Sequence, residues 1–183
     1  MSCNYKIKDQ EKLHFVTFTV INWIDVFIRS EYKNIVVDSL NYCIDKKGLE
    51  VYAWCIMTSH VHLILGTKGD NKLEDIIRDI KRHTSKAILN SIKENSQESR
   101  KEWMIWMMER AGKRNPNNKQ YQFWQQHSHP IELNSNYIMD QKLDYIHKNP
   151  VEAGTVSKSE DYLYSSAMDY TGGNGIIKIV LIE

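Results

Sequence analysis

Residues 55–65 form an apolar, β-branched run that is interrupted by two histidines, His60 and His62. This composition favours a β-strand, and alternate residues of a strand point to the same face of the sheet. We therefore expect the two histidines to project side by side, with Val61 buried on the other face. Two imidazoles at this spacing suit a divalent metal ion. The alternative interpretation is a pair of hydrogen-bonded polar residues at the edge of a strand.

The composition is that of a folded, soluble protein, with 42% hydrophobic and 26% charged residues. We expect the 183 residues to form one domain spanning 1–183. A formal net charge of +1 does not by itself indicate a nucleic-acid-binding protein. Three cysteines without a C-x-x-C pair argue against disulfides and zinc–thiolate sites. With neither a signal peptide nor a membrane-spanning run recognisable, we expect a cytoplasmic protein without a membrane partner.

Hydrophobic periodicity predicts alternating strands and helices along the chain. The predicted strands are residues 13–21, 49–57, 60–66, 121–133 and 176–182, and the predicted helices are 31–47, 71–92 and 136–148. Strand, helix, two strands, helix and strand in this order predict the α+β class. The specific expectation is a ferredoxin-like antiparallel sheet with helices packed on one face.

Local signals set the boundaries of the predicted helices. Ser30 is a candidate N-cap, and Gly48 is placed to end the same helix. Asn71 and Glu74 resemble a capping box for the second helix. Pro150 predicts that the third helix stops before it, because the residue preceding a proline disfavours helical geometry.

Residues 94–120 form an inserted segment that is rich in basic and aromatic residues. Its second half, 110–119, combines four cations with no acid, and its glycine, proline and asparagines predict a loop. These cations are Arg110, Lys113, Arg114 and Lys119. Cations for phosphates beside rings for bases, with Trp124 among the rings, suit single-stranded nucleic acid. A solvated loop beside core aromatics is the alternative, and the basic row on helix 71–92 is interpreted as a solvated face.

A second His-x-His motif, His127 and His129, precedes Pro130. Its intervening residue is polar and a proline follows at once, so regular strand geometry is less assured. It competes with the first motif for the metal, and His129 is also a candidate DNA contact.

The helix at 136–148 presents a tyrosine away from its core stripe. Met139, Leu143 and Ile146 recur at helical spacing and form that stripe. At about 100° per residue Tyr145 lies off the stripe, and Asn149 lies four residues on, on the same side. A tyrosine at the boundary of an amphipathic helix is the ordinary explanation, and a functional tyrosine beside a carboxamide is the other.

Three segments together resemble a known family: 57–65 (MTSHVHLIL), 123–126 (FWQQ) and 143–154 (LDYIHKNPVEAG). They are similar to the REP-associated tyrosine transposases, relatives of the single-tyrosine insertion-sequence transposases within the HUH nucleases. The resemblance extends over about residues 15–170. The histidine motif alone is weakly specific, and its combination with Asp-Tyr-Ile-x-x-Asn-Pro-Val is highly specific.

The resemblance implies a metal-dependent DNA transposase and endonuclease that acts on single-stranded or hairpin DNA. His60 and His62 match two metal ligands, and Asn149 matches the polar residue that completes the site for Mg²⁺ or Mn²⁺. Tyr145 matches the nucleophile that forms a covalent 5′-phosphotyrosine. No general base is identified, and His129 and His147 are the two that we consider.

The chain departs from the family pattern in three places. Thr58 and Ser59 stand where the family commonly has proline and asparagine, residues 94–120 are longer than in compact relatives, and the apolar strand at 176–182 can pair with its own sheet or with a second subunit. A homodimer therefore stays open.

Two other functions are retained as alternatives. One is a phosphohydrolase that binds metal through His60, His62 and His129 and uses water as its nucleophile. The other is a non-catalytic descendant that binds structured DNA through residues 110–119.

Overall fold

The computed structural model describes residues 7, 9–116, 120–126 and 130–182. Its centre is a four-stranded antiparallel sheet in the order β2-β3-β1-β4. The strands are β1 (His14–Thr19), β2 (Leu49–Ile56), β3 (His60–Thr67) and β4 (Ile131–Glu132). The predicted α+β class and antiparallel sheet are thereby confirmed.

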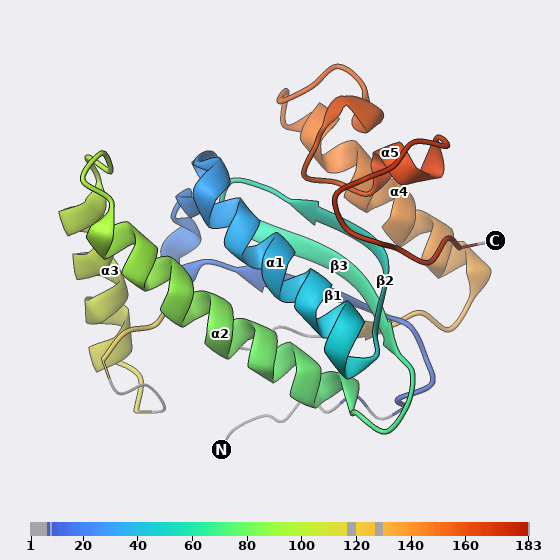
Figure 1. Ribbon diagram of the computed structural model, residues 1–183, viewed down its shortest axis with the longest axis horizontal. Helices are drawn as coiled ribbons and strands as arrows, with labels where there is room; N and C mark the ends of the chain where they lie inside the picture. The colour runs from blue at the N-terminus through green and yellow to red at the C-terminus, as the bar shows by residue number, and fades with distance from the viewer. Residues whose placement is uncertain (1–6, 8, 117–119, 127–129, 183) are drawn as a thin grey trace.

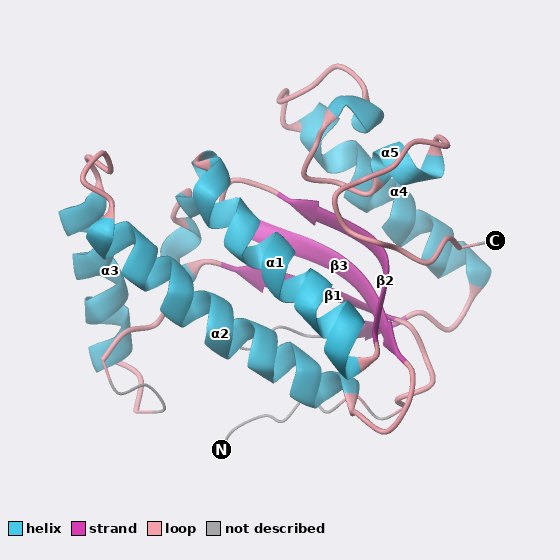
Figure 2. Ribbon diagram, in the orientation of Figure 1, coloured by secondary structure: helices cyan, strands magenta, loops and turns pink. Residues whose placement is uncertain are grey.

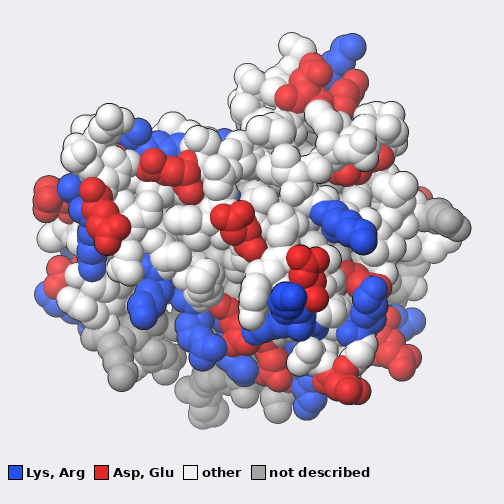
Figure 3. All heavy atoms as spheres, in the orientation of Figure 1, with Lys and Arg blue, Asp and Glu red and all other residues white. Residues whose placement is uncertain are grey.

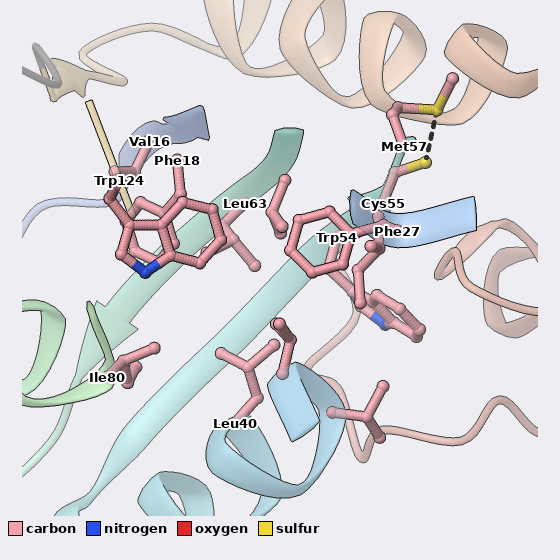
Figure 4. Close-up of a cluster of buried hydrophobic side chains, with 14 of the residues drawn as sticks. Val16, Phe18, Phe27, Leu40, Trp54, Cys55, Met57, Leu63, Ile80 and Trp124 are labelled. Carbon is pink, nitrogen blue, oxygen red and sulfur yellow. Dashed lines mark hydrogen bonds between the residues drawn. The ribbon is translucent and has the colours of Figure 1, made fainter. Parts of the chain in front are cut away.

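Helices α1 (Ser30–Lys47) and α2 (Leu73–Glu94) cover one face of the sheet (Figures 1 and 2). The core lies between this face and the two helices (Figure 4). It contains Phe18, Trp54 and Leu63 from the sheet, with Leu40 and Ile80 from the helices, all of them buried.

Strand alternation sends a different set of side chains to the other face. Thr17 pairs with His62 and Thr19 with His60 across the β1–β3 ladder. Directly opposed residues of antiparallel strands share a face, so these side chains point away from the core that contains Phe18. Helix α4 (Asn136–Glu152) packs on this opposite face, where the Tyr145 ring contacts the His62 ring.

In the inserted segment, residues 94–120, a helix extends into the predicted loop at 110–119. Helix α3 spans Lys101–Lys113, so Arg110 and Lys113 lie on a helix. Its apolar stripe explains the difference, because Met104, Met108 and Gly112 recur at helical spacing and are buried. Gly112 lies in the last turn of the helix. Because it has no side chain, the backbone of residues 120–121 can approach it closely.

A buried carboxylate anchors the chain that leads into α3. The Glu98 side chain is 1% exposed and accepts hydrogen bonds from Arg29 Nε at 2.8 Å and Arg100 Nε at 3.1 Å. Burial raises the pKa of Glu98, but hydrogen bonds from Arg100 and Arg29 outweigh it and leave the pKa lowered. This cluster fixes the start of the insertion to the beginning of α1.

Helix α4 continues beyond its predicted end. It includes Pro150 and reaches Glu152, with Ala153 N donating to Asn149 O. Proline removes only one N–H from the helical ladder, and the Pro150 ring is buried. The loss of one hydrogen bond in the last turn is thus offset by packing.

The predicted strand at 121–133 is reduced to β4 and an isolated bridge between Val20 and Trp124. The described parts of this segment otherwise run without a regular ladder.

Residues 162–182 run along the outer edge of β2. Ile56 N donates to Tyr164 O, Ser166 N to Trp54 O and Val180 N to Val51 O, each at 2.9 Å. The predicted strand at 176–182 does not form. The Tyr170 hydroxyl donates to Tyr52 O, and it accepts from Ile182 N. A side chain therefore takes the place of a strand ladder at this point.

Charges of both signs are interspersed over the outer surface of the molecule on the side of α1 and α2 (Figure 3). On α2, Arg78 pairs with Asp75, and Asp79 pairs with both Arg82 and Lys47. This matches the predicted solvated face for Arg78 and Arg82. Lys81 of the same row departs from it, because it is partly buried, lies over the Phe18 ring and donates to Gln125 O. No helix in the described ranges is long and apolar enough to cross a membrane.

Candidate active site

The two histidines begin β3 and lie side by side as predicted, with ring centroids 4.7 Å apart. His62 is buried, with Nδ1 2.9 Å from Thr17 Oγ1, and His60 is half-buried, with Nδ1 3.2 Å from Ser59 Oγ. When each Nδ1–H donates to its hydroxyl, each Nε2 keeps its lone pair. One β-strand residue, Thr17, and one turn residue, Ser59, thus orient two potential ligand atoms.

Burial also holds both rings neutral near neutral pH. Burial first, and then the charges of His60 and Lys142, together lower the pKa of His62 to about 3. Burial lowers the pKa of His60 as well, although Asp25 opposes this shift. Neutral imidazole is the form that binds metal ions, so the environment suits this role.

Tyr145 of α4 reaches the same place from across the face of the sheet. Its hydroxyl lies 3.4 Å from Nε2 of His62, and the two ring centroids are 5.0 Å apart. Phe15 stacks on His62 with centroids 5.6 Å apart and meets Tyr145 edge-on at 6.1 Å. Because Tyr145 is 42% exposed, an external substrate can reach the hydroxyl.

A cation lies one helical turn before the tyrosine. Lys142 Nζ is 4.8 Å from the Phe15 ring centroid and 5.8 Å from the Tyr145 ring centroid. A positive charge here favours an anion that approaches the tyrosine hydroxyl. Lys142 was not among the residues singled out by sequence, although its position three residues before Tyr145 places it on the same helix face.

Asn149 follows Tyr145 by one helical turn and is partly buried. In the described chain no hydrogen bond joins its side chain to either histidine. Among the described residues there is also no cluster of three or more His, Cys, Asp or Glu side chains. The described geometry therefore unites His60, His62 and Tyr145, and the metal-ligand role of Asn149 stays a prediction.

His147 points to a different part of the molecule from Tyr145. Its Nε2 lies 2.9 Å from Ser166 Oγ, and its ring packs against Tyr170 with centroids 5.0 Å apart. Burial lowers the pKa of His147 to about 4. The residue joins α4 to the segment that covers the edge of β2, which makes it an unsuitable base for Tyr145.

Comparison with known proteins now decides the family. The family model described as "Transposase IS200 like" matches residues 8–149, which include both histidines, Tyr145 and Asn149. The chain belongs to the IS200-like transposase family. It is thereby assigned to a family of enzymes that act on DNA, as its resemblance to tyrosine transposases implied.

A solved structure shares this fold. A REP-associated tyrosine transposase, described as bound to a REP hairpin, aligns with a TM-score of 0.65 and 18% identity, over 98% of this chain and 92% of that chain. A putative transposase from Deinococcus radiodurans aligns with a TM-score of 0.45 and 15% identity, over 77% of this chain and 92% of that chain. No curated protein matches.

The predicted DNA contacts of this IS200-like transposase are dispersed. Arg110 lies over the Trp106 ring at 5.2 Å, Lys113 pairs with Glu109 at 2.8 Å, and Arg114 directly follows α3. Lys119 and His129 lie outside the described residues. None of the described cations contacts the histidine–tyrosine site directly, so their role in DNA binding stays a prediction.

The structure buries Trp124, one of the predicted DNA contacts. Trp124 is 6% exposed, its Nε1 donates to Thr84 Oγ1 at 3.1 Å, and its ring stacks on Phe27. It packs between the sheet and α2, and little of its ring is exposed.

Sequence reasoning missed two further residues at the site of the transposase. Thr17 fixes His62, and the strand alternation that places the histidines would have placed it once the β1–β3 register was known. Trp23 lies edge-on to His60 with centroids 5.4 Å apart, and no periodic signal in its sequence neighbourhood marks it.

Proposed function

We propose that this member of the IS200-like family cleaves and rejoins single-stranded or hairpin DNA through a covalent bond between Tyr145 and a DNA 5′-phosphate. The observation that carries the proposal is the 3.4 Å separation between the Tyr145 hydroxyl and Nε2 of His62. The hairpin named for the similar REP-associated structure supports a folded DNA substrate.

The donor atoms of the site fit a divalent metal ion. His60 and His62 offer Nε2 atoms whose rings are held through Nδ1, and Asn149 would add an amide oxygen from α4. Such a mixed set of nitrogen and oxygen ligands accepts Mg²⁺ or Mn²⁺ when phosphate oxygens complete it. When bound, the ion would act as a Lewis acid that polarises the scissile phosphate.

The side chains supply the nucleophile and its surroundings. The Tyr145 oxygen forms a bond to phosphorus while the bond from phosphorus to the 3′ oxygen breaks, which leaves a 5′-phosphotyrosine and a free 3′-OH. The Tyr145 hydroxyl must lose its proton as this bond forms. The charge of Lys142 beside the ring favours the incoming phosphate.

Rejoining is the reverse reaction. A 3′-OH attacks the phosphotyrosine, the phosphorus–tyrosine bond breaks, and Tyr145 regains its proton. Since the number of phosphoester bonds is conserved, no nucleotide cofactor is required. Exclusion of water is the remaining requirement, and Phe15 packs beside both His62 and Tyr145.

The test is adduct formation on labelled hairpin oligonucleotides with Mn²⁺ or Mg²⁺, read on a denaturing gel. A slowly migrating, protease-sensitive band is expected for the wild type. This band is expected to be absent for Tyr145→Phe. Tyr137→Phe is the matched control, because Tyr137 is an exposed tyrosine in the first turn of the same helix. The control is expected to keep the band.

Three outcomes would overturn the proposal. An adduct that persists in Tyr145→Phe would place the nucleophile elsewhere. Cleavage without any adduct would favour the phosphohydrolase. Metal-independent binding with no cleavage across a varied set of hairpins would favour a non-catalytic DNA-binding protein.

A further inference from the structure

Trp23 is a large apolar side chain that stays in solvent beside the candidate active site. It is 58% exposed, and its ring centroid lies 5.4 Å from that of His60 at an interplanar angle of 74°. In the neighbouring η2 (Val26–Ile28), Val26 and Phe27 are fully buried, whereas Trp23 at the end of η1 (Ile21–Trp23) is not. Trp23 therefore offers exposed aromatic surface next to a metal-ligand candidate.

The backbone that carries this ring has an unfavourable conformation. Asn22 and Trp23 have φ angles of 54° and 55°, in the left-handed region. Asparagine tolerates this region, whereas a bulky aromatic residue rarely adopts it. Such strain persists only where surrounding contacts impose it, and it concentrates at functional sites.

The contacts that impose it come from three parts of the chain. Trp23 N donates to Val20 O at 3.0 Å, Ile21 N to Phe123 O at 2.7 Å, and Val20 N to Ser59 O at 2.9 Å. The last of these involves the residue that precedes His60. The turn is thereby fixed to the start of β3, and the position of Trp23 is tied to that of the histidine.

A cleft of about 510 Å³ begins at the residue next to Trp23. Ile21 and Asn22 form one side of it, and the end of α3 with the residues that follow forms the other. Its described lining contains the cations Arg110 and Arg114 and no acid. This charge suits a phosphate backbone, and the neighbouring amide side chains offer polar contacts to bases.

We propose that Trp23 is a stacking platform for a base adjacent to the scissile phosphate, and that the cleft beside it holds the backbone of the single strand leading away from the site. The proposal rests on the proposed function and adds the path of the strand. An indole face accepts any base, so Trp23 contributes affinity and position rather than sequence choice. The arginines contribute a salt-dependent term.

The first experiment locates the stacked base directly. The probe is a short oligothymidylate that contains one 5-iododeoxyuridine, irradiated with the full-length protein in EDTA and followed by tryptic digestion and mass spectrometry. The crosslink is expected at Trp23, which is the only tryptophan in the tryptic peptide 13–29. Crosslinks confined to Trp103 or Trp106 of α3 would overturn the proposal.

The second experiment measures affinity for the same oligothymidylate by fluorescence anisotropy in EDTA. Trp23→Ala is expected to weaken binding by about five- to a hundred-fold, and Trp23→Phe by much less. Tyr42→Ala is the matched control, because Tyr42 is also 58% exposed but lies on α1, on the other side of the sheet. Equal affinity of wild type and Trp23→Ala would overturn the proposal, since a tryptophan that only orients His60 would not affect binding without metal.

The two proposals fail separately. If Trp23 is no platform but Tyr145 is the nucleophile, the phosphotyrosine adduct forms while the crosslink maps elsewhere. If Tyr145 is not the nucleophile, the crosslink to Trp23 persists, while the adduct either does not form or also forms in Tyr145→Phe. Tyr145→Phe is expected to leave the crosslink unchanged.

Discussion

Thr17 Oγ1 lies 2.9 Å from Nδ1 of His62, on the adjacent strand of the sheet. This contact fixes the orientation of the imidazole, because the other ring nitrogen then faces Tyr145. The geometry of the site therefore depends on a strand residue that contacts no substrate.

Replacement of Thr17 by valine is expected to weaken Mn²⁺ binding by about 10- to 100-fold, since the ring loses the hydrogen bond that orients it. Isothermal titration calorimetry of Mn²⁺ with the DNA-free protein checks this. Thr17→Ser keeps a hydroxyl and should restore most of the affinity. Equal affinities for the valine variant and the wild type would show that Phe15 packing alone holds His62.

Lys142→Gln is expected to slow formation of the covalent DNA adduct by about ten-fold, because the charge beside Tyr145 and the incoming phosphate is lost. Single-turnover gel assays measure the rate. Lys148→Gln is the matched control, since Lys148 is on the same helix but pairs with Asp144 at 2.6 Å. Equal slowing in both variants would indicate a general effect of net charge.

Because of Glu98, we expect the free energy of unfolding to decrease at acid pH, and this decrease is called the acid limb. Burial raises the pKa of Glu98, but hydrogen bonds from Arg100 and Arg29 leave it lowered in the folded state. The stabilisation is thus present above the unfolded-state pKa and is lost as the pH falls through the folded-state pKa.

Glu98→Gln should lower the free energy of unfolding by roughly 1–3 kcal/mol at neutral pH, because two guanidinium groups lose their carboxylate. It should also flatten the acid limb. Urea titrations at a series of pH values check both effects. An acid limb of unchanged steepness in the variant would assign the pH dependence to other carboxylates.

Gly112→Ala is expected to destabilise the junction between α3 and the chain that follows. A Cβ at this position would lie 2.3 Å from the Gln120 carbonyl oxygen and 2.8 Å from Tyr121 Cα. Both contacts are with backbone, which yields less readily than a side chain, so a loss of about 1–3 kcal/mol is expected. A urea midpoint equal to that of the wild type would show that residues 120–121 move aside at little cost.

The arrangement of the sheet and of the histidines could be predicted because local patterns specify it. Alternation in 60–66 placed His60 and His62 on one face, and Gly48 ended α1 as predicted with φ at 70°. Helical spacing also placed Tyr145 off the core stripe. These features depend on residues close together in the sequence.

The features that sequence did not predict depend on partners far along the chain. Trp124 is aromatic and near a basic segment, but only the fold shows that Thr84 of α2 accepts its N–H. The segment 176–182 has a strand-like composition. The Tyr170 hydroxyl, however, donates to the Tyr52 carbonyl of β2, the strand that this segment would have paired with. The role of Thr17 can be recognised only from the β1–β3 register, which places it opposite His62.

Residues 162–182, which run along the outer edge of β2, affect the order in which the site is assembled during synthesis. The histidine face needs β1, β2 and β3, all of which precede residue 68. The helix that carries Tyr145 is fastened through His147 to Ser166, and Ser166 is in turn bonded to Trp54. A growing chain can therefore complete its histidine face long before the helix that carries Tyr145 is fastened against it. On the proposed function, an emerging polypeptide would gain its complete site only after residues beyond 166 have left the ribosome.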